Sequence, residues 1–399
     1  MMTENAIPKS QQGSDQSMPS DGSTSSARLM LDQGLAQVSK WEVDSAQESF
    51  NKALELAERD GEQPLKSDVF VNRGMLQING GNLMEGLKSL AEALSIADEL
   101  EDKSRSMACL GSMGTVFLST CDYKGASQAF GRALSLAREL DHREAIAGYL
   151  NNLGLVYWEV SEYERVIQVF EEALRIAMQE NNLEIQKNAT IQLVKANFAL
   201  DKSAAVLSYA RLLLELLGEN DSPSIRWEAQ EMIVLSMMKE NNYRAAISEA
   251  KAALNNAVQR KSKDAQLKFL GYLADAYYGK GEVDAAAEQY QAALDLSVRL
   301  QETKMEARLL GRLGAVFADL DQLEKSNDFL QRSLALCLKL EEFQTAGEQL
   351  YFLALNHQQM EQIPQAVEYC QQAMTQFEKI NSRLYLERGR ELLAKLESL

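Results

Sequence analysis

The sequence is poor in the residues that most often build metal, disulfide or catalytic sites. Its 399 residues include only 2 histidines, 4 cysteines and 5 prolines. The cysteines show no CxxC pair, which disfavours zinc sites and disulfides. We expect His142 in an exposed connection and His357 at a packing position, because neither has the spacing of a metal motif such as HExxH. No GxxxxGK[ST], GxGxxG or GxSxG occurs. The sequence therefore predicts no enzyme and no metal or other cofactor; an enzyme would need one that co-purifies.

Long apolar runs and strand-like alternation are also missing. No span approaches 18 apolar residues, and no apolar run flanked by positive charge begins the chain. We therefore expect neither membrane insertion nor a secretory leader. With so few prolines and only 22 glycines, the chain is not β-rich. These absences predict an all-α protein of the reducing cytoplasm.

Positive charge is scarce as well. Lysine and arginine number 41 and aspartate and glutamate 58, and the net charge is 41 − 58 = −17. Phosphate backbones and anionic lipid surfaces attract positive charge, so we expect no nucleic-acid partner. The one short basic run, residues 259–263, is interpreted as a solvated turn. Residues 1–24 are rich in Ser, Gln, Gly and Pro, and they predict a disordered tail.

One pattern extends over the rest of the chain at a period of 40 residues. A mostly large apolar position recurs at Phe50, Leu90, Phe130, Phe170, Ala210, Ala250, Tyr290, Leu330 and Cys370. A mostly small position precedes it by 16 residues, at Gly34, Gly74, Gly114, Gly154, Val194, Val234, Ala274, Gly314 and Ala354. A small residue lets two helices approach closely, and a large residue beside the contact fills the remaining space. The pattern predicts nine helix-turn-helix units in one register.

The best-preserved unit, residues 147–177, carries the clearest motif. Its Leu153-Gly154, Tyr157, Tyr163, Phe170 and Ala173 resemble the signature of the tetratricopeptide repeat (TPR). The proline that usually closes a 34-residue repeat is missing. The resulting 40-residue form is similar to kinesin light chains, Pins-type adaptors and bacterial peptide-sensing regulators.

The resemblance implies a right-handed α-solenoid over residues 25–386. Its nine repeats would start near residues 27, 67, 107, 147, 187, 227, 267, 307 and 347. A further helix at 382–399, with Leu384, Leu392, Leu393 and Leu396 on one stripe, is expected to cap the last apolar face. The alternative is a dimerisation surface, so terminal helices could support a homo-oligomer.

Repeat five, residues 187–226, departs most from the pattern. It has Val194 for the small residue, Ala210 for the large one and Leu213 where other repeats have Ala. One interpretation is compensated drift. The other is a weak interface between repeats one to four and repeats six to nine.

In the TPR family the first helix of each repeat lines the concave surface that binds peptides. The positions that this implies for peptide binding here are Asn72, Asn152, Trp158, Lys195, Lys268, Tyr272, Asp275, Tyr278, Arg308 and Arg312. Within this set, we hypothesise a basic site of Arg308 and Arg312 beside Tyr272 and Tyr278. The alternative is that both arginines only balance nearby carboxylates, Asp275 or Glu348.

The resemblance favours a non-catalytic scaffold that binds a peptide segment or helix of a partner protein in its groove, as an assembly factor or complex subunit. The alternative is a peptide-sensing regulator whose superhelix changes shape when it binds its ligand.

Overall fold

The computed structural model describes residues 25–398, and these residues form nineteen helices and no strand. The tail predicted at residues 1–24 lies outside the described residues. The chain divides into two units, one ending at Val156 and the other beginning at Tyr157. The boundary falls inside α7 (Arg143–Glu159). Each unit is described by itself.

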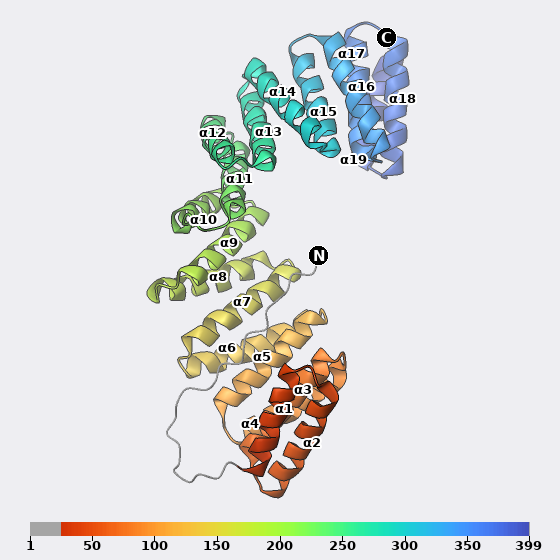
Figure 1. Ribbon diagram of the computed structural model, residues 1–399. Helices are drawn as coiled ribbons and strands as arrows, with labels where there is room; N and C mark the ends of the chain where they lie inside the picture. Colours follow the sequence, from red (N-terminus) through yellow and green to blue (C-terminus); the bar gives the residue numbers. More distant parts are fainter. Residues whose placement is uncertain (1–24, 399) are drawn as a thin grey trace. The chain divides into compact units, whose positions relative to one another are not determined.

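In the first unit, consecutive helices pack against each other in chain order (Figure 1). They are α1 (Ser26–Ser39), α2 (Val43–Arg59), α3 (Gln63–Asn79), α4 (Leu83–Glu99), α5 (Lys103–Ser119) and α6 (Tyr123–Glu139). The first helices of successive repeats also touch, α1 with α3 and α3 with α5.

The second unit repeats this arrangement. Its helices are α8 (Tyr163–Gln179), α9 (Leu183–Ala199), α10 (Ser203–Leu216), α11 (Pro223–Lys239), α12 (Tyr243–Gln259), α13 (Lys263–Lys280), α14 (Val283–Leu300), α15 (Thr303–Asp319), α16 (Leu323–Lys339), α17 (Phe343–Gln359), α18 (Ile363–Lys379) and α19 (Arg383–Glu397). Odd-numbered helices up to α17 are the first helices of the repeats, and even-numbered helices are the second. The all-α fold and the series of helix pairs are confirmed.

The large and small positions of the 40-residue pattern meet in the core. All nine members of the series from Phe50 to Cys370 are at most 2% exposed. A Cβ added to Gly34 would lie 2.5 Å from the Phe50 ring, and one added to Gly114 would lie 2.6 Å from the Phe130 ring. These distances are too short for any side chain, so glycine sets how closely the two helices of a repeat approach.

Most helix ends share one turn geometry. In seventeen of the eighteen connections between described helices, one residue has positive φ, and these residues recur every 20 positions. In the turn after α2, Gly61 N–H donates to Glu58 O and Glu62 N–H donates to Ala57 O, the pattern of a Schellman motif. Because turns within and between repeats have the same form, two helices and two turns add up to the constant 40-residue step.

The exception closes repeat five. Helix α10 ends at Leu216, and Leu217 is extended at ψ 119°. A side-chain cap replaces the regular turn: Asp221 accepts a hydrogen bond from Gly218 N–H at 2.8 Å and pairs with Lys187 at 2.7 Å. Inside the repeat, Val194 and Leu213 are each 2% exposed. Larger residues therefore fill the core that Ala210 leaves open.

The terminal helix α19 occupies the register of a first helix of a tenth repeat. Leu392 and Leu396 are buried against α18 and α17, as expected for a cap. Leu384 was predicted on the same stripe but is 59% exposed, because it lies in the first turn of α19 on the side away from that core. The buried Cys370 thiol donates to Gly389 O at 3.3 Å and joins the cap to α18.

Both histidines take structural positions. His357 stacks on Tyr369 with ring centroids 5.1 Å apart, as predicted for a packing residue. His142 lies in the turn before α7, where its Nδ1 accepts a hydrogen bond from Ala145 N–H.

Candidate functional site

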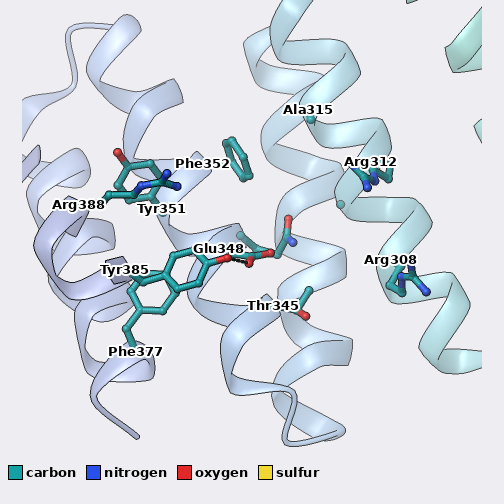
Figure 2. A pocket seen from close by; sticks show the side chains of 12 residues that line it. Arg308, Arg312, Ala315, Thr345, Glu348, Tyr351, Phe352, Phe377, Tyr385 and Arg388 are labelled. Atoms are coloured by element: carbon teal, nitrogen blue, oxygen red, sulfur yellow. Dashed lines mark hydrogen bonds between the residues drawn. The ribbon is translucent and has the colours of Figure 1, made fainter. Parts of the chain in front are cut away.

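A pocket of about 490 Å³ lies near the C-terminal end of the second unit (Figure 2). Three successive first-helix positions, on α15, α17 and α19, form its walls, and α18 adds one ring. The residues that line it are Arg308, Gly311, Arg312, Ala315, Thr345, Glu348, Gln349, Tyr351, Phe352, Phe377, Tyr385 and Arg388. Because Arg308, Glu348 and Arg388 are 40 residues apart, they are the same repeat position on three neighbouring helices.

The cations of this pocket outnumber its anions. Glu348 is the one carboxylate that lines it, and this group accepts hydrogen bonds from Tyr385 Oη at 2.7 Å and Gln344 Nε2 at 3.2 Å. Arg308 and Arg388 are exposed, and neither forms an ion pair within 4.0 Å of a described carboxylate. In a chain of net charge −17, the pocket therefore holds two arginines with spare hydrogen-bonding capacity.

Aromatic side chains lie between these arginines. Phe352 is 41% exposed, and the Tyr351 and Phe352 ring centroids are 6.4 Å apart. Tyr385 stacks on Phe377 at 4.8 Å. The hydrogen bond to Glu348 raises the pKa of Tyr385, so the phenol is neutral and donates at physiological pH. Together the rings provide rigid apolar contact area beside the charges.

Gln349 is a buried amide with unused hydrogen-bonding capacity. It is 5% exposed, and its Oε1 has no hydrogen-bond partner among the described residues. A Cβ at Gly311 would lie 2.9 Å from Gln349 Nε2, so the absent side chain of Gly311 makes room for this carboxamide. An unpaired buried carbonyl oxygen is costly, and a ligand that donates to it would recover that cost.

Of the ten residues predicted from the sequence, only Arg308 and Arg312 line this pocket. Tyr272 and Tyr278 do not, and their hydroxyls donate to Glu231 and Asp319. The aromatic neighbours of the arginines come instead from the following repeat and the cap.

The alternative hypothesis was that Arg308 and Arg312 only balance nearby carboxylates, and Arg312 alone has such a partner. Arg312 Nε lies 3.7 Å from Asp275 Oδ1, and Asp275 also accepts a hydrogen bond from the buried Tyr290 hydroxyl. Arg308 makes no such pair with Glu348. Arg312 therefore has a carboxylate partner in Asp275, whereas Arg308 has none within 4.0 Å among the described residues.

The two predicted lysines form ion pairs between neighbouring first helices. Lys195 Nζ lies 3.5 Å from Glu228, and Lys268 Nζ lies 2.9 Å from Glu231. Exposed pairs of this kind contribute little to stability. They connect the first helices of adjacent repeats.

The remaining predicted residues lie elsewhere. Trp158 is half-buried, with its ring edge-on to Tyr163 at 5.2 Å. Asn152 is half-buried on α7. In the first unit, Asn72 lines a smaller pocket of about 190 Å³ and donates to the Asp68 carbonyl at 2.8 Å. None of these residues is among those that line the pocket at α15–α19.

Sequence reasoning missed Gln349, Tyr351, Phe352, Tyr385 and Arg388 as site residues. A signal for two of them was available. Arg388 and Tyr385 continue the 40-residue register of Arg308 and Met305 into α19, so reading the cap as a tenth first helix would have found them. Nothing in the sequence marks the unpaired oxygen of Gln349.

The comparisons with known proteins agree with this fold. A model of the tetratricopeptide repeat family matches residues 150–184. A Signal Transduction ATPase with Numerous Domains from Pyrococcus horikoshii, which has a tetratricopeptide repeat sensor, has a similar structure at a TM-score of 0.53 and 12% identity. The alignment covers 83% of this chain and 49% of that one, so this chain spans about half the length of that protein.

Weaker likenesses were found to two other structures, and the fold assignment does not depend on them. The apo form of RapI shares 15% identity at a TM-score of 0.43, over 69% of this chain and 99% of its own. A putative kinesin light chain from Podospora anserina shares 14% at 0.42, over 49% of this chain and 96% of its own. No curated protein matches the sequence. The family match shows a tetratricopeptide repeat at residues 150–184, and the 40-residue register and the helix pairs in series extend the fold of such repeats over the described residues.

Proposed function

We propose that this protein is a non-catalytic scaffold that binds a segment of a partner protein along its first helices, with the pocket at α15–α19 as the main recognition point. One observation carries the proposal: Arg308 and Arg388 remain unpaired beside exposed aromatic rings in a strongly acidic chain. Arginines and aromatic residues of this kind dominate the energetics of protein interfaces.

The pocket is suited to binding because helices hold its side chains. Since α17 packs against α15 and is joined to α19 by side-chain contacts, a ligand has little receptor backbone to order when it binds. An incoming carboxylate would form charge-assisted hydrogen bonds to the guanidinium groups of Arg308 and Arg388, which have no carboxylate partner among the described residues.

The composition of the pocket supports a binding role over a catalytic one. Its lining contains neither histidine nor cysteine, and Tyr385 and Gln344 already hydrogen-bond its one carboxylate. Burial raises the pKa of the Cys109, Cys337 and Cys370 thiols, which makes them poor nucleophiles. Because all four cysteines are free thiols, we propose the cytoplasm as the compartment.

The proposal is tested by crosslinking and affinity capture from the native cell. We expect the double variant Arg308→Glu/Arg312→Glu to lose partners that the wild type captures. Arg332→Glu/Lys339→Glu on α16 makes the same charge change at two exposed residues outside the pocket and should retain them. If both double variants capture the same set of proteins as the wild type, the site assignment is wrong.

The second candidate, a peptide-sensing regulator, is favoured by the division of the pocket among separate helices. A ligand that contacts α15, α17 and α19 at once would change their spacing if the free and bound arrangements differ. Small-angle scattering decides between the two: a regulator would change its radius of gyration on saturation with ligand, and a rigid scaffold would not.

A further inference from the structure

We propose that the pocket at α15–α19 selects a peptide segment in which a large apolar residue lies between two acidic positions. This inference rests on the proposed function and names the class of ligand that the site recognises. It follows from where the charges, the rings and the unpaired amide lie.

The positive charges lie at opposite sides of the pocket. Arg308 and Arg312 are on α15, Arg388 is on α19, and Figure 2 shows the ring of Phe352 and the carboxylate of Glu348 between them. Arg308 and Arg388 have no carboxylate partner among the described residues, so each has room for one acidic side chain.

The placement of these arginines on two different helices favours a ligand with two acidic groups. Helix α17 lies between α15 and α19, and packed helices are about 8–10 Å apart, so the two outer axes are roughly 16–20 Å apart. An extended chain advances about 3.3 Å per residue. Because the arginine side chains extend into the pocket, two acidic side chains about three to five residues apart would match them.

Aromatic rings supply the apolar part of the lining between the charges, beside the carboxylate of Glu348. Phe352 is 41% exposed there, and Tyr351 and Tyr385 flank it. At about 490 Å³ the pocket can hold one large side chain together with the adjoining backbone. Burying that side chain against the rings would add a hydrophobic contribution that an anion alone cannot provide.

Gln349 distinguishes a peptide from other anionic ligands. Its buried Oε1 needs a donor, and the Nε2 of the same carboxamide can donate to an acceptor. The peptide group offers both, an N–H and a C=O, whereas an ionised carboxylate offers acceptors only. The carboxamide occupies the space that the absent side chain of Gly311 leaves at the pocket wall.

The test measures fluorescence anisotropy of labelled, end-blocked peptides with the full chain. The probe is Asp-Glu-Ala-Phe-Ala-Glu-Asp, and a second peptide has the same composition with its acids gathered at one end, Ala-Phe-Ala-Glu-Glu-Asp-Asp. A third replaces every acid by its amide, and a fourth replaces Phe by Ser. We expect the first peptide to bind at least about 10-fold more tightly than each of the others, because the second and third lose a charge-assisted contact and the fourth loses the apolar contact of Phe, and either loss is of that size.

Matched variants locate the binding. Arg388→Glu should weaken the first peptide about 10-fold or more, whereas Arg390→Glu, an exposed arginine on the same helix outside the pocket, should leave it unchanged. Gln349→Met keeps the bulk and removes both hydrogen-bonding groups, so it should weaken all peptides by a similar factor. Circular dichroism on each variant confirms that the helices remain.

Three results would overturn the inference. One is equal affinity for the first and second peptides, and another is equal loss in Arg388→Glu and Arg390→Glu. The third is complete competition by inorganic phosphate at the concentration of the peptide, which would indicate a simple anion site. If the peptides fail to bind while Arg308→Glu/Arg312→Glu still loses captured partners, the ligand class is wrong and the proposed function stands. If both experiments fail, the pocket has no binding role.

Discussion

Tyr385 of the terminal helix donates a hydrogen bond to Glu348 of α17, with 2.7 Å between Oη and Oε1. The pair joins the cap to the last repeat, and both residues line the pocket. The contact that caps the array and the proposed binding pocket therefore use the same face of α19.

Tyr385→Phe should loosen α19 without unfolding the chain. The substitution keeps the ring that stacks on Phe377 and removes only the hydroxyl that bonds to Glu348. We expect about 0.5–1.5 kcal/mol less stability of the terminal helix. Hydrogen exchange over residues 383–397 should accelerate by roughly 3- to 10-fold, with residues 223–259 as the internal reference. Unchanged exchange in α19 would show that the hydrogen bond does not hold the cap.

A pair of glycines in repeat three separates close packing from helix propensity. A Cβ added to Gly114 would lie 2.6 Å from the buried Phe130 ring, whereas a Cβ added to Gly131 would have no atom within 4 Å. Gly114→Ala should destabilise by about 1–3 kcal/mol through overpacking. Gly131→Ala should stabilise by up to about 1 kcal/mol through propensity. Urea unfolding of both variants measures the difference, and effects of the same sign would refute the close-contact interpretation.

The irregular end of repeat five should open first within the second unit. Helix α10 ends before a loop at 217–222 that depends on a cap from Asp221, while the core around Val194 is closed. We expect faster amide exchange over residues 203–222 than over the second helix of repeat six, residues 243–259. Uniformly slow exchange across 187–226 would exclude a weak interface there and leave compensated drift as the explanation.

Tyr278 should titrate well above an ordinary tyrosine. Burial, and then its hydrogen bond to Asp319, raise its pKa to about 12. Because this exceeds the ordinary value of about 10, the neutral phenol stabilises the fold. That contribution is complete below about pH 10 and is lost as the pH rises toward the folded value. Subtracting the phenolate absorbance of Tyr278→Phe from that of the wild type isolates this titration, and Asp319→Asn should shift it to lower pH. A midpoint near 10 in the wild type would contradict the assignment.

The sequence by itself determined the fold and the repeat position of each residue. Phe50 and its eight equivalents lie in the core because a strict 40-residue step gives all nine the same position in a helix pair. The role of Gly34 and Gly114 can be predicted from the sequence for the same reason, because a close helix crossing requires a small residue. Arg308 and Arg312 were found because repeat position predicts which helix face a residue occupies.

Only the tertiary structure decided which neighbours those residues have. In a stack of repeats a side chain can contact either the preceding or the following helix. Its rotamer and the charges nearby determine which of the two helices it contacts. Tyr272 and Tyr278 therefore bond to Glu231 and Asp319 and do not line the pocket at α15–α19. The pocket depends on contacts between residues 40 and 80 positions apart, and a repeating sequence pattern does not specify these individually. The left-handed turns could not be predicted from residue type either. Of the seventeen described residues that adopt positive φ, fourteen are not glycine. Hydrogen bonds between the helix ends stabilise this conformation in place of an intrinsic preference.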